Sequence, residues 1–178
     1  MKIAIIGYSG SGKSTLAKKL AKHYSIPKLH LDTLQFQPGW QDSDRDWMSE
    51  QMDNFLSKNT DWVIDGNYTW CCYEERMEEA DQIIFLNFSA LNCLLRTFKR
   101  YLNYRGTVRE SMAAGCPEQF NWEFIRWILW DGRTSSHKDH YQKICSDYAD
   151  KVTIITNQKE LDSFLYKKER VGQKSVIR

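Results

Sequence analysis

The chain has 178 residues, of which 42% are hydrophobic and 27% are charged, a balance typical of one soluble globular domain. Its formal net charge of +2 is too small to favour nucleic acid or a membrane on charge alone. No apolar run approaches the roughly 20 residues that cross a bilayer, so we expect no membrane span and no signal peptide. The five scattered cysteines indicate reduced thiols in a cytoplasmic protein.

Short apolar segments alternate with longer amphipathic ones, which predicts an α/β fold with a parallel sheet covered by helices. In chain order we expect a strand at 2–6, a helix at 14–24, a strand at 27–31, a loop at 36–42, a helix at 43–58, a strand at 62–64, a helix at 72–80, a strand at 82–88, a helix at 90–104, an irregular segment at 106–117, helices at 121–130 and 135–149, a strand at 151–156 and a helix at 159–166.

These elements form one domain over residues 1–166, and the polar, basic tail at 167–178 is expected to fray. The tryptophans at regular spacing in this pattern are predicted to lie in the core: Trp47, Trp62, Trp122, Trp127 and Trp130.

The first expected strand is followed by a phosphate-binding sequence. Residues 7–14 read GYSGSGKS, a full match to G-x-x-x-x-G-K-[ST], between an apolar strand and an amphipathic helix. Glycines let the backbone turn its N–H groups inward, Lys13 supplies a cation for the β- and γ-phosphates, and the Ser14 hydroxyl is a ligand for Mg²⁺. We therefore expect ATP and Mg²⁺ as cofactors, with the nucleotide bound by Gly7, Ser9, Gly10, Ser11, Gly12, Lys13, Ser14 and Thr15.

Two carboxylates follow predicted strands, whose carboxyl ends line the ligand crevice of an α/β sheet. Asp65 ends the run Trp62–Asp65 and is a candidate ligand for Mg²⁺, although a strand-end aspartate also caps turns. Asp32 could orient or deprotonate an acceptor hydroxyl or bind a base or sugar, and its alternative is again a turn.

A basic stretch runs from residue 82 to 109 without an Asp or Glu. Arg96, Lys99, Arg100 and Asn103 share one helix face, opposite an apolar stripe. Such an unpaired cluster of cations favours contact with a transferring phosphate, while a solvated surface and a nucleic-acid contact stay open. Aromatic residues in loops after strand ends either form a wall for a planar acceptor or pack the loops: Phe36, Trp40, Tyr68 and Trp70.

Together these features resemble the adenylate-kinase-like branch of P-loop kinases, and most closely the family labelled DNA topology modulation protein (FlaR-like). The resemblance covers roughly residues 1–166 and is carried by 7–14 and by the segments His30-Leu31-Asp32, Pro38-Gly39-Trp40 and Asp65-Gly66-Asn67-Tyr68. It implies a three-layer P-loop NTPase fold with a five-stranded parallel sheet in the order 2-3-1-4-5. It also implies a helical lid at about 105–135, between strands 4 and 5.

The resemblance further implies roles for four arginines. Arg96 is expected near the adenine or the phosphates, Arg100 and Arg133 at the transferring phosphate once the lid closes, and Arg76 at the acceptor. Residues 65–68 stand where adenylate kinases carry an Asp-Gly-Phe-Pro-Arg run, so the arginine that grips the acceptor phosphate is absent and AMP is not the expected acceptor.

Three functions are compatible with the sequence. The first is an ATP- and Mg²⁺-dependent phosphotransferase acting on a small molecule, most readily a nucleoside or nucleotide. The second is a regulatory ATP-binding protein or ATPase that contacts nucleic acid, and the third is an ATP-binding module with little turnover. An expected lid favours the first, because excluding water protects the γ-phosphate from hydrolysis. The acceptor and the oligomeric state are not determined by the sequence.

Overall fold

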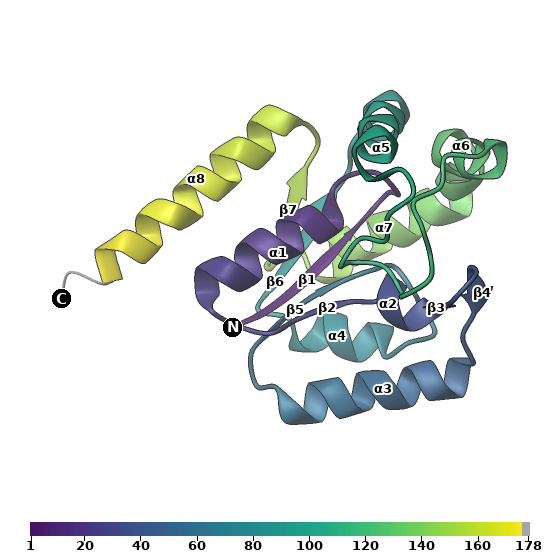
Figure 1. Cartoon of the computed structure of the whole chain (residues 1–178). Coiled ribbons are helices and arrows are strands. Elements are labelled where there is room, and N and C mark those ends of the chain that lie inside the picture. Colours follow the sequence, from purple (N-terminus) through teal and green to yellow (C-terminus); the bar gives the residue numbers. More distant parts are fainter. Residues whose placement is uncertain (176–178) are drawn as a thin grey trace.

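Five apolar segments pair into one parallel sheet in the computed structural model, which describes residues 1–175 (Figure 1). Strand β1 pairs with both β5 and β6, so that Ile5 lies between Asp65 and Ile84. The outer strands β2 and β7 add to β5 and β6 respectively. The five strands are β1 (Lys2–Gly7), β2 (Lys28–His30), β5 (Trp62–Asp65), β6 (Gln82–Leu86) and β7 (Val152–Ile155).

The sheet order is β2-β5-β1-β6-β7, with β1 at the centre. The numerals differ from the expected order 2-3-1-4-5 because the predicted loop at 36–42 is an antiparallel hairpin of β3 (Phe36–Gln37) and β4 (Gln41–Asp42), which takes two numbers. Within the main sheet, the first strand along the chain lies between the third and the fourth. The hairpin turns at Pro38-Gly39, where the backbone of Gly39 has φ 79°.

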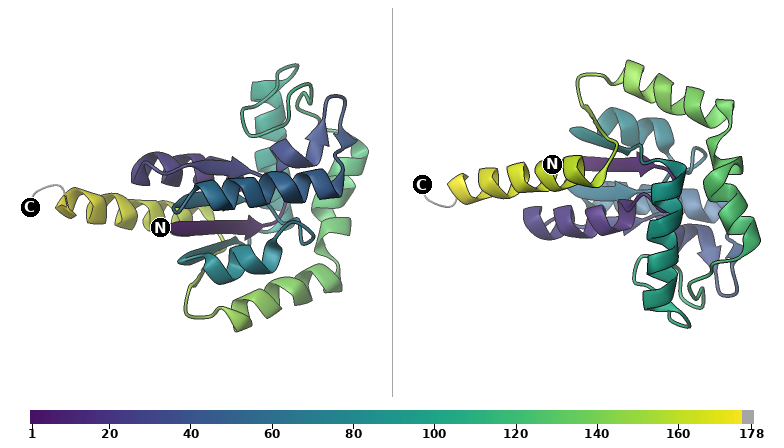
Figure 2. Two further views of the ribbon diagram at one scale, coloured as in Figure 1. Left: turned by 90° about the horizontal axis from the view of Figure 1, so that it is seen from below. Right: turned by 90° about the horizontal axis from the view of Figure 1, so that it is seen from above.

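Helices cover both faces of the sheet, which makes three layers. On one face lie α1 (Lys13–Tyr24) and α8 (Gln158–Ser175), and on the other lie α3 (Arg45–Lys58), α4 (Tyr73–Glu79) and α7 (Ser135–Asp147). Beyond the carboxyl ends of the strands lie α2 (Asp32–Gln35), α5 (Ala90–Tyr104), α6 (Trp122–Leu129) and the 3₁₀ turn η1 (Asp131–Arg133). Figure 2 shows α5, α6 and the hairpin at one end of the sheet, and the start of β1 and the last turns of α8 at the other.

The core lies on both sides of the central strands. Every residue from Ile3 to Ile6 is fully buried, as expected for a strand of a parallel sheet with helices on both faces. On the side of α7, the rings of Phe85 and Tyr141 stack at 4.5 Å between centroids. No helix within residues 1–175 combines the length and the apolar character that a membrane crossing requires.

The tryptophan prediction is confirmed for one residue and wrong for four. Trp62 in β5 is fully buried, but Trp47, Trp122, Trp127 and Trp130 are 43–67% exposed. Helix α3 buries Met48 and Met52 instead, and α6 buries Ile128, because α6 lies beyond the strand ends and packs against the core along one narrow side only.

Two boundaries also differ from the sequence prediction. Helix α3 begins at Arg45 rather than at Ser43, because the Asp44 side chain accepts a hydrogen bond from the Trp47 amide and so caps the helix. The tail from 167 to 175 continues α8 as a helix rather than fraying, and residues 176–178 lie outside the described part of the chain.

Two neighbouring isoleucines of β7 provide a matched test of the packing. Ile155 is 1% exposed and Ile154 is 48% exposed. We expect Ile155→Ala to lower the free energy of unfolding by about 2–5 kcal/mol, because it leaves a cavity in the core, and Ile154→Ala to lower it by less than about 1 kcal/mol. Urea denaturation of both variants measures the difference. Equal losses would contradict the observed orientation of β7.

Candidate functional site

The loop between β1 and α1 makes a tight turn beneath neighbouring elements. Gly7 and Gly10 have φ angles of 139° and 80°, a region that L-residues rarely adopt. A Cβ atom on Gly7 would lie 2.5 Å from the Leu86 carbonyl oxygen, and one on Gly10 would lie 2.6 Å from the Cys93 carbonyl oxygen. The loop is therefore packed against β6 and α5, and glycine is required at both positions.

Two side chains hold this loop from inside. The Asn67 amide donates to the Gly7 carbonyl oxygen (2.7 Å) and accepts from the Gly7 N–H (3.1 Å). Lys13 Nζ donates to the carbonyl oxygens of Gly7 (2.9 Å) and Tyr8 (3.3 Å). Burial lowers the pKa of Lys13, and the carboxylates of Asp32 and Asp65 partly oppose that change. An anion in the loop would favour the charged form of the lysine further.

The two residues predicted to bind metal lie in direct contact. Ser14 Oγ donates to Asp65 Oδ2 at 2.8 Å, and the other Asp65 oxygen pairs with His30 Nδ1. Asp65 and His30 are both buried. Hydroxyl and carboxylate oxygens are the hard ligands that Mg²⁺ takes in proteins, so this donor set fits the ion.

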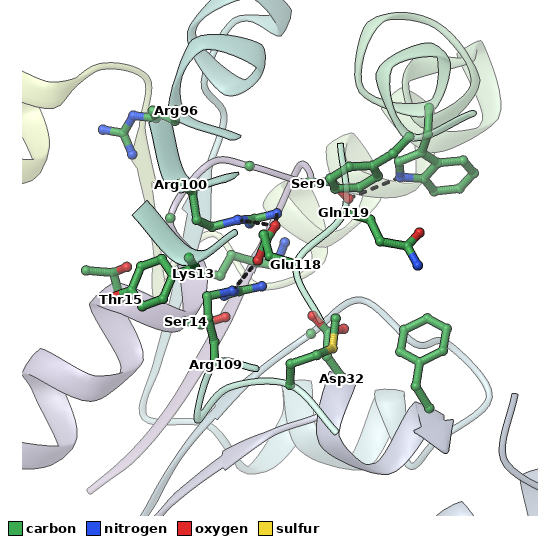
Figure 3. A pocket seen from close by; sticks show the side chains of 18 of the residues that line it. Ser9, Lys13, Ser14, Thr15, Asp32, Arg96, Arg100, Arg109, Glu118 and Gln119 are labelled. Carbon is green, nitrogen blue, oxygen red and sulfur yellow. Dashed lines mark hydrogen bonds and ion pairs between the residues drawn. The ribbon is translucent and has the colours of Figure 1, made fainter. Parts of the chain in front are cut away.

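A cavity of about 790 Å³ opens beside the loop, beyond the carboxyl ends of the strands (Figure 3). It is lined by most residues that the sequence predicts for the site: Ser9, Gly10, Gly12, Lys13, Ser14, Thr15, Asp32, Phe36, Trp40, Tyr68, Arg96 and Arg100. Three predicted residues lie just outside the lining and contact residues that line it. The Gly7 carbonyl oxygen accepts from Lys13, the Ser11 carbonyl oxygen accepts from Arg96, and the Asp65 carboxylate accepts from Ser14.

Helix α5 turns its basic face toward the cavity. Arg96, Lys99, Arg100 and Asn103 all line it, whereas Leu91, Leu95, Phe98 and Leu102 on the opposite face are 43–69% exposed. Arg96 Nη1 donates to the Ser11 carbonyl oxygen at 2.6 Å, and its guanidinium lies 4.1 Å above the Phe88 ring. The polar side of this helix is therefore its inner side.

A buried carboxylate neutralises two of the cations. Glu118 Oε1 accepts from Arg100 Nε at 2.8 Å, and Glu118 Oε2 accepts from Arg109 Nε (Figure 3). Burial lowers the pKa of Arg100, nearby Arg109 lowers it further, and Glu118 opposes both. The expectation of an unpaired basic cluster is wrong for this pair, because Glu118, from outside the basic stretch, folds back between the two guanidinium groups.

Asp32 lies at the end of the cavity away from Arg96 (Figure 3). Its Oδ1 accepts a hydrogen bond from the Tyr68 hydroxyl at 2.7 Å. Burial raises the pKa of Tyr68, and Asp32 raises it further, so the phenol stays protonated as a donor. The rings of Phe36 and Trp40, which line the same cavity, meet edge to face at 5.3 Å.

Three further residues predicted near the ligands lie outside the cavity lining and make no contact with Lys13, Ser14 or Arg96. Arg76 is 1% exposed and donates to the carbonyl oxygens of Cys71 (3.1 Å), Cys72 (3.3 Å) and Tyr68 (3.0 Å). Arg133 donates to the Ile128 and Phe88 carbonyl oxygens and lies 3.8 Å above the Tyr8 ring. Trp70 stacks against the Arg45 guanidinium. In this structure backbone carbonyls accept from both guanidinium groups, and the contact of Arg76 and Arg133 with ligands stays a prediction.

Several lining residues were not predicted to belong to the site, among them Asn67, Arg109, Glu118 and Trp127. Asn67 could have been predicted, because it belongs to the segment 65–68 that carries the family resemblance. Glu118 could not, because its partners Arg100 and Arg109 lie in a helix and in an irregular segment, and no local pattern connects the three residues. Trp127 Nε1 donates to Ser9 Oγ at 3.1 Å, a contact across 118 positions of sequence.

Comparison with solved structures identifies chains of the same fold. A shikimate kinase from Acinetobacter baumannii in complex with shikimate is 17% identical with a TM-score of 0.53, over 98% of this chain and 90% of that one. A gluconokinase from Sinorhizobium meliloti 1021 is 17% identical with a TM-score of 0.50, over 98% and 92%. No protein-family model and no curated protein matches the sequence. At this identity the likeness establishes the fold.

The role of Arg76 can be tested by stability. We expect Arg76→Met to lower the free energy of unfolding by about 3 kcal/mol, because three carbonyl groups lose their donor in a buried site. Arg126→Met is the matched control. Arg126 is exposed and pairs with Asp131, so its loss is expected below about 1 kcal/mol. Chemical denaturation compares the two, and an Arg76→Met protein of parental stability would contradict the structural role.

Proposed function

We propose that the chain is an ATP- and Mg²⁺-dependent phosphotransferase that acts on a small molecule, most readily a nucleoside or nucleotide. The observation that carries the proposal is the complete phosphate loop at 7–14, which shares one cavity with Asp32. The fold common to a shikimate kinase and a gluconokinase supports it, since both are named as kinases of small molecules.

In this proposal the loop holds the phosphates of ATP. No side chain caps the N-terminus of α1, so its free N–H groups are available to an anion. Lys13 would exchange its loop carbonyls for the β- and γ-phosphates, and Gly7, Ser9, Gly10, Ser11, Gly12 and Thr15 complete the cradle. Ser14 and Asp65 would hold Mg²⁺, which neutralises phosphate charge when bound.

The cations of α5 supply the remaining electrostatics of the proposed site. Arg96 and Arg100 are proposed to contact the phosphates, since they reach the cavity from the helix that packs on the loop. The segment at about 105–135 is proposed as the lid, because Arg109, Glu118 and Trp127 of this segment contribute to the lining. Arg76 and Arg133 are not included in the proposed site, since neither lines the cavity.

At the acceptor end, Asp32 is proposed as the general base or the group that orients the acceptor. Phe36, Trp40 and Tyr68 would form the wall of that site. The alternative of a regulatory protein that contacts nucleic acid receives less support. On the basic face of α5, Arg96 and Arg100 are bound at the cavity and Lys99 alone is exposed, which leaves few free cations for a nucleic-acid backbone.

Lys13→Ala tests the nucleotide site. Charge-assisted contacts to phosphate are worth about 1.5–3 kcal/mol, so we expect MgATP affinity to fall roughly 10- to 150-fold. Lys19→Ala is the control, because Lys19 is an exposed residue of the same helix. Nucleotide-dependent thermal shifts of both variants measure the effect. If Lys13→Ala retained the affinity of Lys19→Ala, the phosphate-loop assignment would fall.

Asp32→Asn tests the chemistry separately from binding. The amide keeps the size of the carboxylate but cannot take a proton, so we expect phosphate transfer to a hydroxyl to slow by about 10²–10⁴-fold while MgATP binding is retained. ADP formation with the acceptor present provides the measurement. A transfer rate equal to that of the parent would remove Asp32 from the reaction.

A further inference from the structure

The acceptor end of the cavity has the wrong charge for a phosphate. Asp32 forms no ion pair with any residue between 1 and 175, and its one protein hydrogen bond comes from the neutral Tyr68 hydroxyl. That bond occupies Oδ1 and leaves Oδ2 available to a second donor. A ligand placed here therefore meets an anion with room for one more hydrogen bond.

The arginines on this side of the molecule are bound to other groups. Arginine is the residue that holds a phosphate most specifically, because its guanidinium donates in bidentate form. Arg76 gives its guanidinium to three backbone carbonyls, and Arg100 and Arg109 share Glu118. A phosphate beside Asp32 would be repelled by the carboxylate and would have to displace one of these buried contacts, whereas a neutral hydroxyl would do neither.

The cavity that Asp32 lines also has an aromatic wall, and one residue of this wall has an unfavourable backbone conformation. Phe36 and Trp40 meet edge to face there. Trp40 has φ 66°, in the left-handed region that costs an L-residue about 1–2 kcal/mol. Trp40 closes the three-residue loop of the hairpin, and with Phe36 it gives the cavity an aromatic surface against which a ring can pack.

We propose, on the basis of the phosphotransferase function above, that the acceptor is a neutral alcohol carried by a ring: a nucleoside, not a nucleoside monophosphate. Its hydroxyl donates to Asp32 Oδ2, and its ring lies against Phe36 and Trp40. The inference rests on the pairing of Asp32 with Tyr68, the bound state of Arg76, Arg100 and Arg109, and the aromatic wall.

The reaction balances with these groups. The acceptor oxygen forms a bond to the γ-phosphorus of ATP while its proton passes to Asp32. The bond between the γ-phosphorus and the β–γ bridging oxygen breaks, and its electron pair leaves with ADP. The products are a phosphomonoester and ADP, and Asp32 later releases the proton to solvent. Tyr68 is a positioning residue, because it acts by orienting the carboxylate.

The test is a panel of matched acceptors given to the full chain with MgATP, in which each nucleoside is paired with its 5′-monophosphate. Products are separated by chromatography and identified by ³¹P NMR. We expect at least one nucleoside to be phosphorylated about tenfold or more faster than its monophosphate. Preferred phosphorylation of the monophosphates would overturn the inference, and so would transfer to neither class by a protein that binds MgADP. A protein that binds no nucleotide would instead refute the proposed phosphotransferase function itself.

Two variants test the acceptor end. Trp40→Gly removes the ring and accepts the left-handed backbone, so we expect the acceptor KM to rise about tenfold with little change in the KM for ATP. The control is Trp47→Ala, an exposed tryptophan of α3 that lies outside both the lining and the proposed lid, for which neither KM should change. An unchanged acceptor KM in Trp40→Gly would contradict the aromatic wall.

The second variant, Tyr68→Phe, keeps the ring and removes the hydrogen bond to Asp32. We expect kcat with a nucleoside acceptor to fall while the acceptor KM stays the same, because the variant keeps the ring at the cavity wall and loses only the hydrogen bond that orients the carboxylate. MgADP affinity should stay the same. A kcat equal to that of the parent would show that Tyr68 does not orient the base.

Discussion

The turn between the central strand and the first helix is the constraint on which the rest of the site depends. At Gly7 and Gly10 the chain must adopt positive φ angles while passing within a few ångströms of β6 and α5. Asn67 holds the same turn from the end of β5. The sheet, α5 and the β5 loop therefore fix one backbone path, and that path leaves the first N–H groups of α1 open to an anion.

The organisation of charge follows from that turn. The site brings Lys13, Arg96, Arg100 and Arg109 around one cavity, and such a group is stable only with partners. Loop carbonyls accept from Lys13 and Arg96, and Glu118 accepts from the other two cations. The loop carbonyls that accept from Lys13 and Arg96 are groups that the phosphates of a nucleotide could replace. At the far end Asp32 has only a neutral partner, so the cavity changes sign along its length.

Local sequence predicted the parts of the site that local geometry determines. Residues 7–14 specify their own turn, and the rule that parallel strands end at one edge correctly brought Ser14 and Asp65 together across 51 positions. The sequence alone could not determine the contacts of Arg76 and Arg133, because the partner of a guanidinium group depends on how the surrounding elements pack. Periodicity likewise found the two faces of α5 and the stripe of α6 but not which side faces inward, so Trp122 and Trp130 are exposed where the pattern predicted core.

The central claim is that this turn captures the phosphates of a nucleotide together with Mg²⁺. Isothermal titration of the unmodified chain with ADP, with and without Mg²⁺, measures it directly. The account predicts saturable one-to-one binding with a dissociation constant between about 1 µM and 1 mM, and weaker binding when the metal is chelated. The absence of saturable heat in both titrations, with no displacement of a fluorescent nucleotide, would contradict it.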